Sequence, residues 1–147
     1  MEVNPLQRNS QRDTQIIHSM MTKDVITAKS SDSLKWALTR MLAFDIGSIV
    51  VVDDQNTPIG ILTERDIRRK VVVLLEKLGS AVLELKISEA MSSPLITLGS
   101  DATTEEATQL MLVKKIKRIP VVDSHGSLAG IVSESDLLAL RRGNPTT

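Results

Sequence analysis

A glycine, a hydroxyl and a carboxylate recur twice in this chain at the same spacing. Residues 60–66 read Gly-Ile-Leu-Thr-Glu-Arg-Asp, and residues 130–136 read Gly-Ile-Val-Ser-Glu-Ser-Asp. Each stretch is predicted to pass from a strand into a helix, where unpaired backbone N–H groups favour an anion. Gly60 permits close approach to the strand, Thr63 places a hydroxyl at the helix start, and Asp66 follows one turn later. A carboxylate accepts hydrogen bonds from vicinal hydroxyls, so this spacing suits a ribose phosphate.

The same spacing also has a purely structural interpretation. Thr63 with Asp66, and Ser133 with Asp136, fit the helix-capping pattern, in which two side chains bond each other's backbone across the first turn. Such a pair needs no ligand, and a duplicated structure duplicates its caps. The residues alone therefore leave ligand binding and capping open.

The two stretches belong to a longer internal repeat. Residues 21–66 align with residues 91–136 at a constant offset of 70, and sixteen of the 46 aligned positions are identical. Unrelated sequences would share roughly one position in fifteen to twenty, so the chain is an internal duplication. The predicted organisation is a flexible N-terminal extension, a first repeat, a second repeat and a flexible tail, with boundaries at 1–15, 16–79, 80–142 and 143–147.

Each repeat has the pattern of strand, helix, strand, strand and helix. In the first repeat, 25–27 predicts a short strand and the apolar spacing over 34–42 predicts a helix. The β-branched run 49–52 and the stretch 59–62 predict a hairpin. The second helix is expected to begin near Thr63 and to stop at Gly79–Ser80, with an apolar face made by Ile67, Val71, Leu74, Leu75 and Leu78.

The predicted fold class is α/β (α+β), with two repeats that each contain a small sheet and two helices. One such repeat is too small to close a core well, so the repeats are expected to pack about a pseudo-two-fold axis. That arrangement would create two equivalent clefts, which suggests paired ligand sites.

Composition limits the classes of function. Hydrophobic residues make up 41% of the chain, charged residues make up 24%, and 18 basic side chains balance 18 acidic ones, which disfavours binding to nucleic acid or membranes through bulk charge. The chain has no cysteine and only two distant histidines, so no metal site is expected. No hydrolase or phosphate-loop motif is present, so no enzyme is expected. No apolar run reaches a membrane span and no signal peptide is recognisable, so the expected location is the cytoplasm.

The chain resembles a tandem pair of cystathionine-β-synthase-type (CBS) domains. The resemblance covers about residues 17–140 and rests on three motifs in each repeat, at 21–27, 47–53 and 60–66 and at 91–97, 117–123 and 130–136. It implies a sensor module that binds AMP, ADP, ATP or S-adenosylmethionine in clefts between the repeats. It implies no cofactor beyond that regulatory ligand.

The resemblance also implies which residues meet at each cleft. The hydroxyl of each strand-to-helix step is expected near phosphate and its aspartate on the ribose hydroxyls, while Arg65 or Ser135 can also approach phosphate. One cleft is expected to combine Thr63, Arg65 and Asp66 with Thr97, Ile116, Lys117 and Arg118. The other is expected to combine Ser133, Ser135 and Asp136 with Thr27, Ile46, Gly47 and Ser48. The first cleft has more cations and should prefer the more phosphorylated ligand.

The leading interpretation is a stand-alone regulatory pair that binds an adenosine-containing ligand and signals to a protein partner. One alternative is a ligand-free dimerising interaction module. Another is a nucleic-acid-binding module that uses the basic runs, which the zero net charge disfavours. A homodimer through helical faces is expected. Trp36 and Phe44 either pack locally or mark that contact.

Overall fold

The structure is a computed structural model that describes residues 15–93 and 95–141. The predicted flexible extension, apart from Gln15, and the predicted flexible tail lie outside this part. The chain divides into two compact units. The repeat 1 unit comprises residues 25–95, and the repeat 2 unit comprises residues up to 24 together with those from 96 onward.

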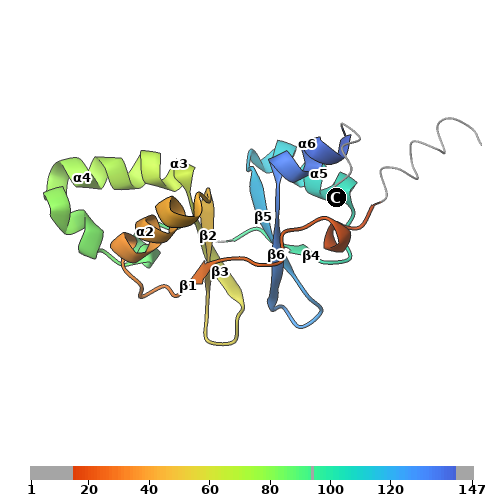
Figure 1. The fold of residues 1–147 in the computed structure, drawn as a ribbon, viewed down its shortest axis with the longest axis horizontal. Helices are drawn as coiled ribbons and strands as arrows, with labels where there is room; N and C mark the ends of the chain where they lie inside the picture. Colours follow the sequence, from red (N-terminus) through yellow and green to blue (C-terminus); the bar gives the residue numbers. More distant parts are fainter. Residues whose placement is uncertain (1–14, 94, 142–147) are drawn as a thin grey trace, which may run out of the picture. The chain divides into compact units, whose positions relative to one another are not determined.

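The repeat 1 unit contains a three-stranded sheet with its helices on one face (Figure 1). Its central strand is buried from Ile49 to Val52, as the apolar run predicts. The first strand runs parallel to the central one, and the third runs antiparallel to it. The elements are β1 (Thr27–Ala28), α2 (Leu34–Phe44), β2 (Ser48–Val52), β3 (Pro58–Thr63), α3 (Glu64–Asp66), η2 (Ile67–Val71), α4 (Val72–Leu78), η3 (Gly79–Glu84) and η4 (Ile87–Glu89).

The repeat 2 unit repeats this order of strands and helices. Its sheet has the strand order β4-β5-β6, and the register pairs Arg118 with Ser133, just as Ser48 pairs with Thr63 in the repeat 1 unit. The fold class predicted from the sequence, with a small sheet and two helices in each repeat, is therefore confirmed. The elements are η1 (Ile17–Ser19), β4 (Leu98–Gly99), α5 (Thr104–Lys114), β5 (Arg118–Val122), β6 (Leu128–Ser133) and α6 (Glu134–Arg141).

Each core is completed by a segment that the sequence assigns to the other repeat. Ile17 lies at the start of the predicted first repeat, yet it is fully buried in the core of the repeat 2 unit. Ile87 lies near the start of the predicted second repeat, yet it is fully buried in the core of the repeat 1 unit. These are the first closing segment (16–22) and the second closing segment (86–92). The compact units thus exchange these segments relative to the sequence repeats, whose predicted boundaries stay a prediction.

Backbone hydrogen bonds fix both closing segments against the last strand of the sheet. Thr22 and Ile131 exchange two N–H···O=C bonds of 2.9 Å. At the equivalent place, Ser92 and Ile61 exchange bonds of 2.8 and 3.3 Å. Each pair is an isolated antiparallel bridge, so each closing segment borders the strand that leads into the candidate site.

The glycine of each strand-to-helix stretch allows this contact. A Cβ atom on Gly130 would lie 2.7 Å from the carbonyl oxygen of Thr22. A Cβ atom on Gly60 would lie 2.5 Å from the sulfur of Met91. The close approach that the glycine permits is therefore that of the protein's own closing segment.

The second helix of the first repeat is not one continuous α-helix. Between α3 and α4 lies the π-helical turn η2, and Gly79, with φ of 60°, ends α4 as predicted. A π-helical turn changes which side chains share a face relative to a 3.6-residue period. Val71 is buried, but Leu75 and Leu78 are 48% and 46% exposed. These two leucines therefore lie largely outside the buried core, and the single apolar face stays a prediction.

Replacing either glycine by alanine should lower the free energy of unfolding, and Gly130→Ala should lower it more than Gly60→Ala. The new Cβ at position 130 meets a backbone carbonyl, whereas the one at position 60 meets a flexible methionine side chain. We expect losses of about 1–3 kcal/mol, typical of overpacking, in urea unfolding experiments. Ser124→Ala, at an exposed turn, is the control. The opposite order of the two losses would contradict this account.

Candidate functional site

The strand-to-helix step of each repeat lies beside the start of the second strand of the same repeat. In the repeat 1 unit, Ser48 pairs with Thr63, and the Glu64 N–H donates to the Gly47 carbonyl at 3.1 Å. The hairpin therefore brings the predicted residues at 47–48 next to those at 63–66. Thr27 belongs to the neighbouring strand β1, where it pairs with Val50.

The repeat 2 unit has the same arrangement with different side chains. Arg118 pairs with Ser133, and the Glu134 N–H donates to the Lys117 carbonyl at 2.8 Å. Thr97 comes directly before β4. Two cations thus stand at the strand start of this repeat, where the first repeat has only glycine and serine.

Both strand-to-helix steps form the capping arrangement that the sequence left open. The Asp66 N–H donates to Thr63 Oγ1 at 3.3 Å, while Asp66 Oδ2 accepts from Thr63 N–H at 2.9 Å. In the second repeat, the Asp136 N–H donates to Ser133 Oγ at 3.1 Å, and Asp136 Oδ2 accepts from Ser133 N–H at 3.0 Å. Capping engages one oxygen of each carboxylate, and an ionised carboxylate has about four acceptor sites. The caps therefore do not exclude a ligand.

Asp66 also binds the second closing segment. Ser92 Oγ donates to Asp66 Oδ1 at 2.6 Å, and Lys70 Nζ lies 3.4 Å from the same oxygen. Lys70 Nζ further donates to the carbonyls of Ala90 and Met91, at 3.1 and 3.3 Å. With only 5% of its surface exposed, Asp66 thus joins the helix start, the lysine one turn later and the closing segment.

The second repeat lacks this arrangement. The positions equivalent to Ser92 and Lys70 are Thr22 and Leu140, and leucine cannot donate a hydrogen bond. In the part of the chain that the structure describes, one hydrogen bond reaches the Asp136 side chain, from the Ser133 N–H to Oδ2. The two carboxylates therefore differ: Asp66 has both oxygens engaged, and Asp136 has one.

The structure groups the predicted site residues by repeat. The predicted contacts between residues of different repeats stay a prediction. The residues with polar groups at the helix starts, Arg65 and Ser135, are both exposed. The repeat 1 unit holds Thr27, Ile46, Gly47, Ser48, Thr63, Arg65 and Asp66, and the repeat 2 unit holds Thr97, Ile116, Lys117, Arg118, Ser133, Ser135 and Asp136.

Sequence reasoning missed Ser92 and Lys70. Ser92 follows Met91 as Thr22 follows Met21, so a repeated hydroxyl at this position was a visible signal. The hydrogen bond between Ser92 and Asp66 forms because the second closing segment packs in the repeat 1 unit, and the repeat pattern does not reveal this packing. Within residues 15–93 and 95–141, no cluster of three or more acidic or histidine side chains could hold a metal ion.

A model of the CBS domain family matches the chain twice, at residues 16–73 and 87–143. An uncharacterized protein of Methanopyrus kandleri is 40% identical over 116 residues, which are 79% of this chain. The chain spans 57% of the length of that relative.

Two solved structures share the fold over almost their whole length. The CBS domain pair of protein MJ0100, in complex with 5′-methylthioadenosine and S-adenosyl-L-methionine, is 25% identical with a TM-score of 0.77, over 88% of this chain and 98% of that one. CBSX2 in complex with AMP is 25% identical with a TM-score of 0.74, over 87% of this chain and 96% of that one.

Asp66→Ala should destabilise the protein more than Asp136→Ala. Loss of a cap costs about 0.5–2 kcal/mol, and we expect this for Asp136→Ala. Asp66→Ala also leaves the Ser92 hydroxyl and Lys70 without their shared acceptor, which should add about 1 kcal/mol. Urea unfolding measures both, with Asp54→Ala in an exposed turn as the control. Equal losses would show that the bonds to the closing segment contribute nothing.

Proposed function

Because the chain belongs to the CBS domain family, we propose that it is a regulatory module whose strand-to-helix steps bind an adenosine-containing ligand. The observation that carries this proposal is the repeated pairing of a hydroxyl and a carboxylate at a helix start, beside the second-strand start of the same repeat. Relatives of the same fold bind AMP or S-adenosyl-L-methionine. The ligand is regulatory, and the proposed role is binding rather than catalysis.

The chemistry of the two steps suits a nucleoside with an anionic group. Each aspartate keeps acceptor capacity beyond its cap, which two vicinal ribose hydroxyls can use. The helix start and neighbouring cations favour phosphate. Lys117 and Arg118 border the step that contains Ser133 and Asp136 within one unit, so we propose that the phosphate of a nucleotide bound there contacts these cations.

Ligand binding at Asp66 would act on the second closing segment. A ribose whose hydroxyls donate hydrogen bonds to Asp66 Oδ1 competes with Ser92 and Lys70, which hold that segment. The segment leads along the chain into the second repeat. We propose that this competition starts the signal, which a protein partner then receives.

A ligand-free interaction module is the second candidate. It is favoured by one observation, namely that both caps are complete and Asp66 already has both oxygens engaged. Among the described residues, none of the helices combines the length and the apolar character that a membrane span requires.

We expect at least one of AMP, ADP, ATP and S-adenosylmethionine to stabilise the protein. At a hundred times its dissociation constant, a ligand specific for the folded state stabilises by about 2.7 kcal/mol. Thermal unfolding screens the four compounds, and calorimetry then gives the stoichiometry. Asp66→Ala and Asp136→Ala should each remove one site, whereas Asp54→Ala should remove none. If no compound binds, or both variants bind like the parent, the interaction module is the better description.

A second binding experiment tests whether Lys117 contributes to the site of Asp136 or to the site of Asp66. In the Asp66→Ala background, where the Asp136 site remains, Lys117→Ala should weaken ATP binding more than AMP binding, because extra phosphate has lost a cation. In the Asp136→Ala background, the same substitution should have little effect. The reverse result would support the contacts between repeats that the sequence resemblance implies. Lys114→Ala, on α5, is the matched control for charge.

A further inference from the structure

The two aspartates of the strand-to-helix steps are not equally open to another molecule. Asp66 is 5% exposed, and donors from Thr63, Lys70 and Ser92 engage both of its oxygens. Asp136 is partly exposed, and the Ser133 N–H engages one of its oxygens. A ribose must donate its hydroxyls to such oxygens, so a ligand finds different conditions at the two steps.

The groups that engage Asp66 Oδ1 are the kind of donors that a ribose would supply. The Ser92 hydroxyl donates to this oxygen at 2.6 Å, and Lys70 Nζ lies 3.4 Å from it. Two vicinal ribose hydroxyls would likewise offer two donors to a carboxylate. The protein therefore already supplies, from its own chain, the contacts that a ribose would make with Oδ1.

Lys70 is held in place by more than Asp66. Its Nζ also donates to the carbonyls of Ala90 and Met91 in the second closing segment, at 3.1 and 3.3 Å. An ammonium group has three N–H donors, and these three acceptors can use all of them. A ligand that takes Asp66 Oδ1 must therefore disturb a group of contacts, all of which lie within the repeat 1 unit.

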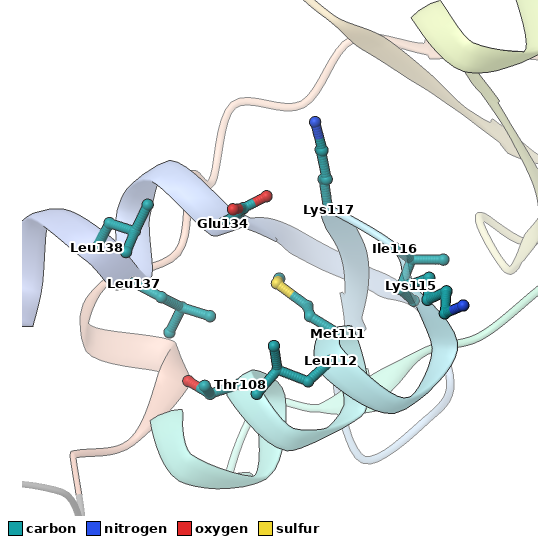
Figure 2. A pocket seen from close by; sticks show the side chains of 9 residues that line it. All are labelled: Thr108, Met111, Leu112, Lys115, Ile116, Lys117, Glu134, Leu137 and Leu138. Atoms are coloured by element: carbon teal, nitrogen blue, oxygen red, sulfur yellow. The ribbon is translucent and has the colours of Figure 1, made fainter.

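Neighbouring charges do not provide the same contacts in the second repeat. Leu140 occupies the position of Lys70. Lys117 and Glu134 line a groove between α5 and α6 together with Leu137 (Figure 2). Neither of the ion pairs found among residues 15–93 and 95–141 involves Asp136. The second oxygen of Asp136 is thus open to a ligand without such competition.

We propose that Lys70 and Ser92 set the ligand affinity of the Asp66 step, because they occupy the carboxylate oxygen that a ribose would use. This inference rests on the proposed function, since it concerns the ligand of that site. A site that is competent for only a fraction of the time loses apparent affinity by that fraction. The net strength of one such hydrogen bond corresponds to a change of about tenfold in an equilibrium constant. The Asp66 step therefore responds only at higher ligand concentrations than its own contacts would require.

Removal of either competitor should tighten binding at the Asp66 step. In the Asp136→Ala background, Lys70→Leu and Ser92→Ala should each lower the dissociation constants of AMP and ATP about three- to tenfold in calorimetry. The gain should be the same for both nucleotides, because the competition concerns the ribose that they share. Lys77→Leu and Ser93→Ala, at exposed positions, are the matched controls. Lys70→Arg keeps the charge and the donors, so it should bind like the background protein.

The reverse substitution tests the same idea in the second repeat. Leu140→Lys places an ammonium group four residues after Asp136, as Lys70 follows Asp66. In the Asp66→Ala background, this variant should bind AMP about threefold more weakly or worse, because a lysine now competes for Asp136. Leu140→Met, which adds no charge, is the control. Unchanged or tighter binding of AMP by Leu140→Lys would contradict the proposed competition.

Hydrogen exchange supplies a readout that needs no ligand. The Ser92 N–H donates to the Ile61 carbonyl at 2.8 Å, and the Thr22 N–H donates to the Ile131 carbonyl at 2.9 Å. Lys70→Leu should accelerate exchange at Ser92 and leave exchange at Thr22 unchanged, because Lys70 holds only the second closing segment. Equal exchange at Ser92 in the parent and the variant would show that Lys70 does not hold this segment, which overturns the inference.

The outcomes separate this inference from the adenosine proposal. If the Asp136→Ala protein binds neither nucleotide, even with Lys70→Leu, the Asp66 step is not an adenosine site and both proposals fail there. If it binds AMP or ATP but Lys70→Leu and Ser92→Ala leave the dissociation constants unchanged, the adenosine proposal stands and the inference is overturned. Weaker binding by these variants, with a greater loss for ATP, would show instead that Lys70 contacts phosphate.

Discussion

Ile17 and Ile87 complete the hydrophobic cores of the two units, although the sequence assigns each of them to the other repeat. Each is fully buried, and each comes from a segment that the sequence assigns to the other repeat. Burying one such side chain stabilises a core by about 1.5–3 kcal/mol, so neither sheet with its helices is complete without the crossed segment. The first closing segment leads into β1 and the second leads into β4. A change in how one unit holds its closing segment is therefore a change in the chain that enters the other unit.

The repeated motif has structural roles in this arrangement that do not depend on a ligand. Gly60 and Gly130 leave room for the closing segments, and the hydroxyl and carboxylate that follow cap the next helix. These roles explain why the residues occur in both repeats without reference to any ligand. They also explain why a ligand could use them: a helix start with its backbone N–H groups, a hydroxyl and a carboxylate is fixed in place by the fold itself.

Local pattern was enough for most of the fold. The β-branched run at 49–52 and the helix at 34–44 follow from period and composition, and the offset of 70 carries both to the second repeat. The crossing of the closing segments could not be read from that pattern, because the sequence assigns 16–22 to the first repeat and 86–92 to the second. For the same reason, the hydrogen bond between Ser92 and Asp66 could not be predicted from the sequence. The π-helical turn η2 could not be read from the sequence, because it departs from the helical period on which the prediction rested.

The positions at which the repeats differ are as informative as those that they share. Shared residues such as Met41 with Met111, or Ile49 with Ile119, are buried and maintain the common core. Some differing pairs lie at the candidate sites, where Gly47 and Ser48 of the first repeat correspond to Lys117 and Arg118 of the second. At Asp66, a lysine and a serine engage the carboxylate, and at Asp136 the same positions hold leucine and threonine. Divergence at these positions makes the two strand-to-helix steps chemically unequal within a common fold.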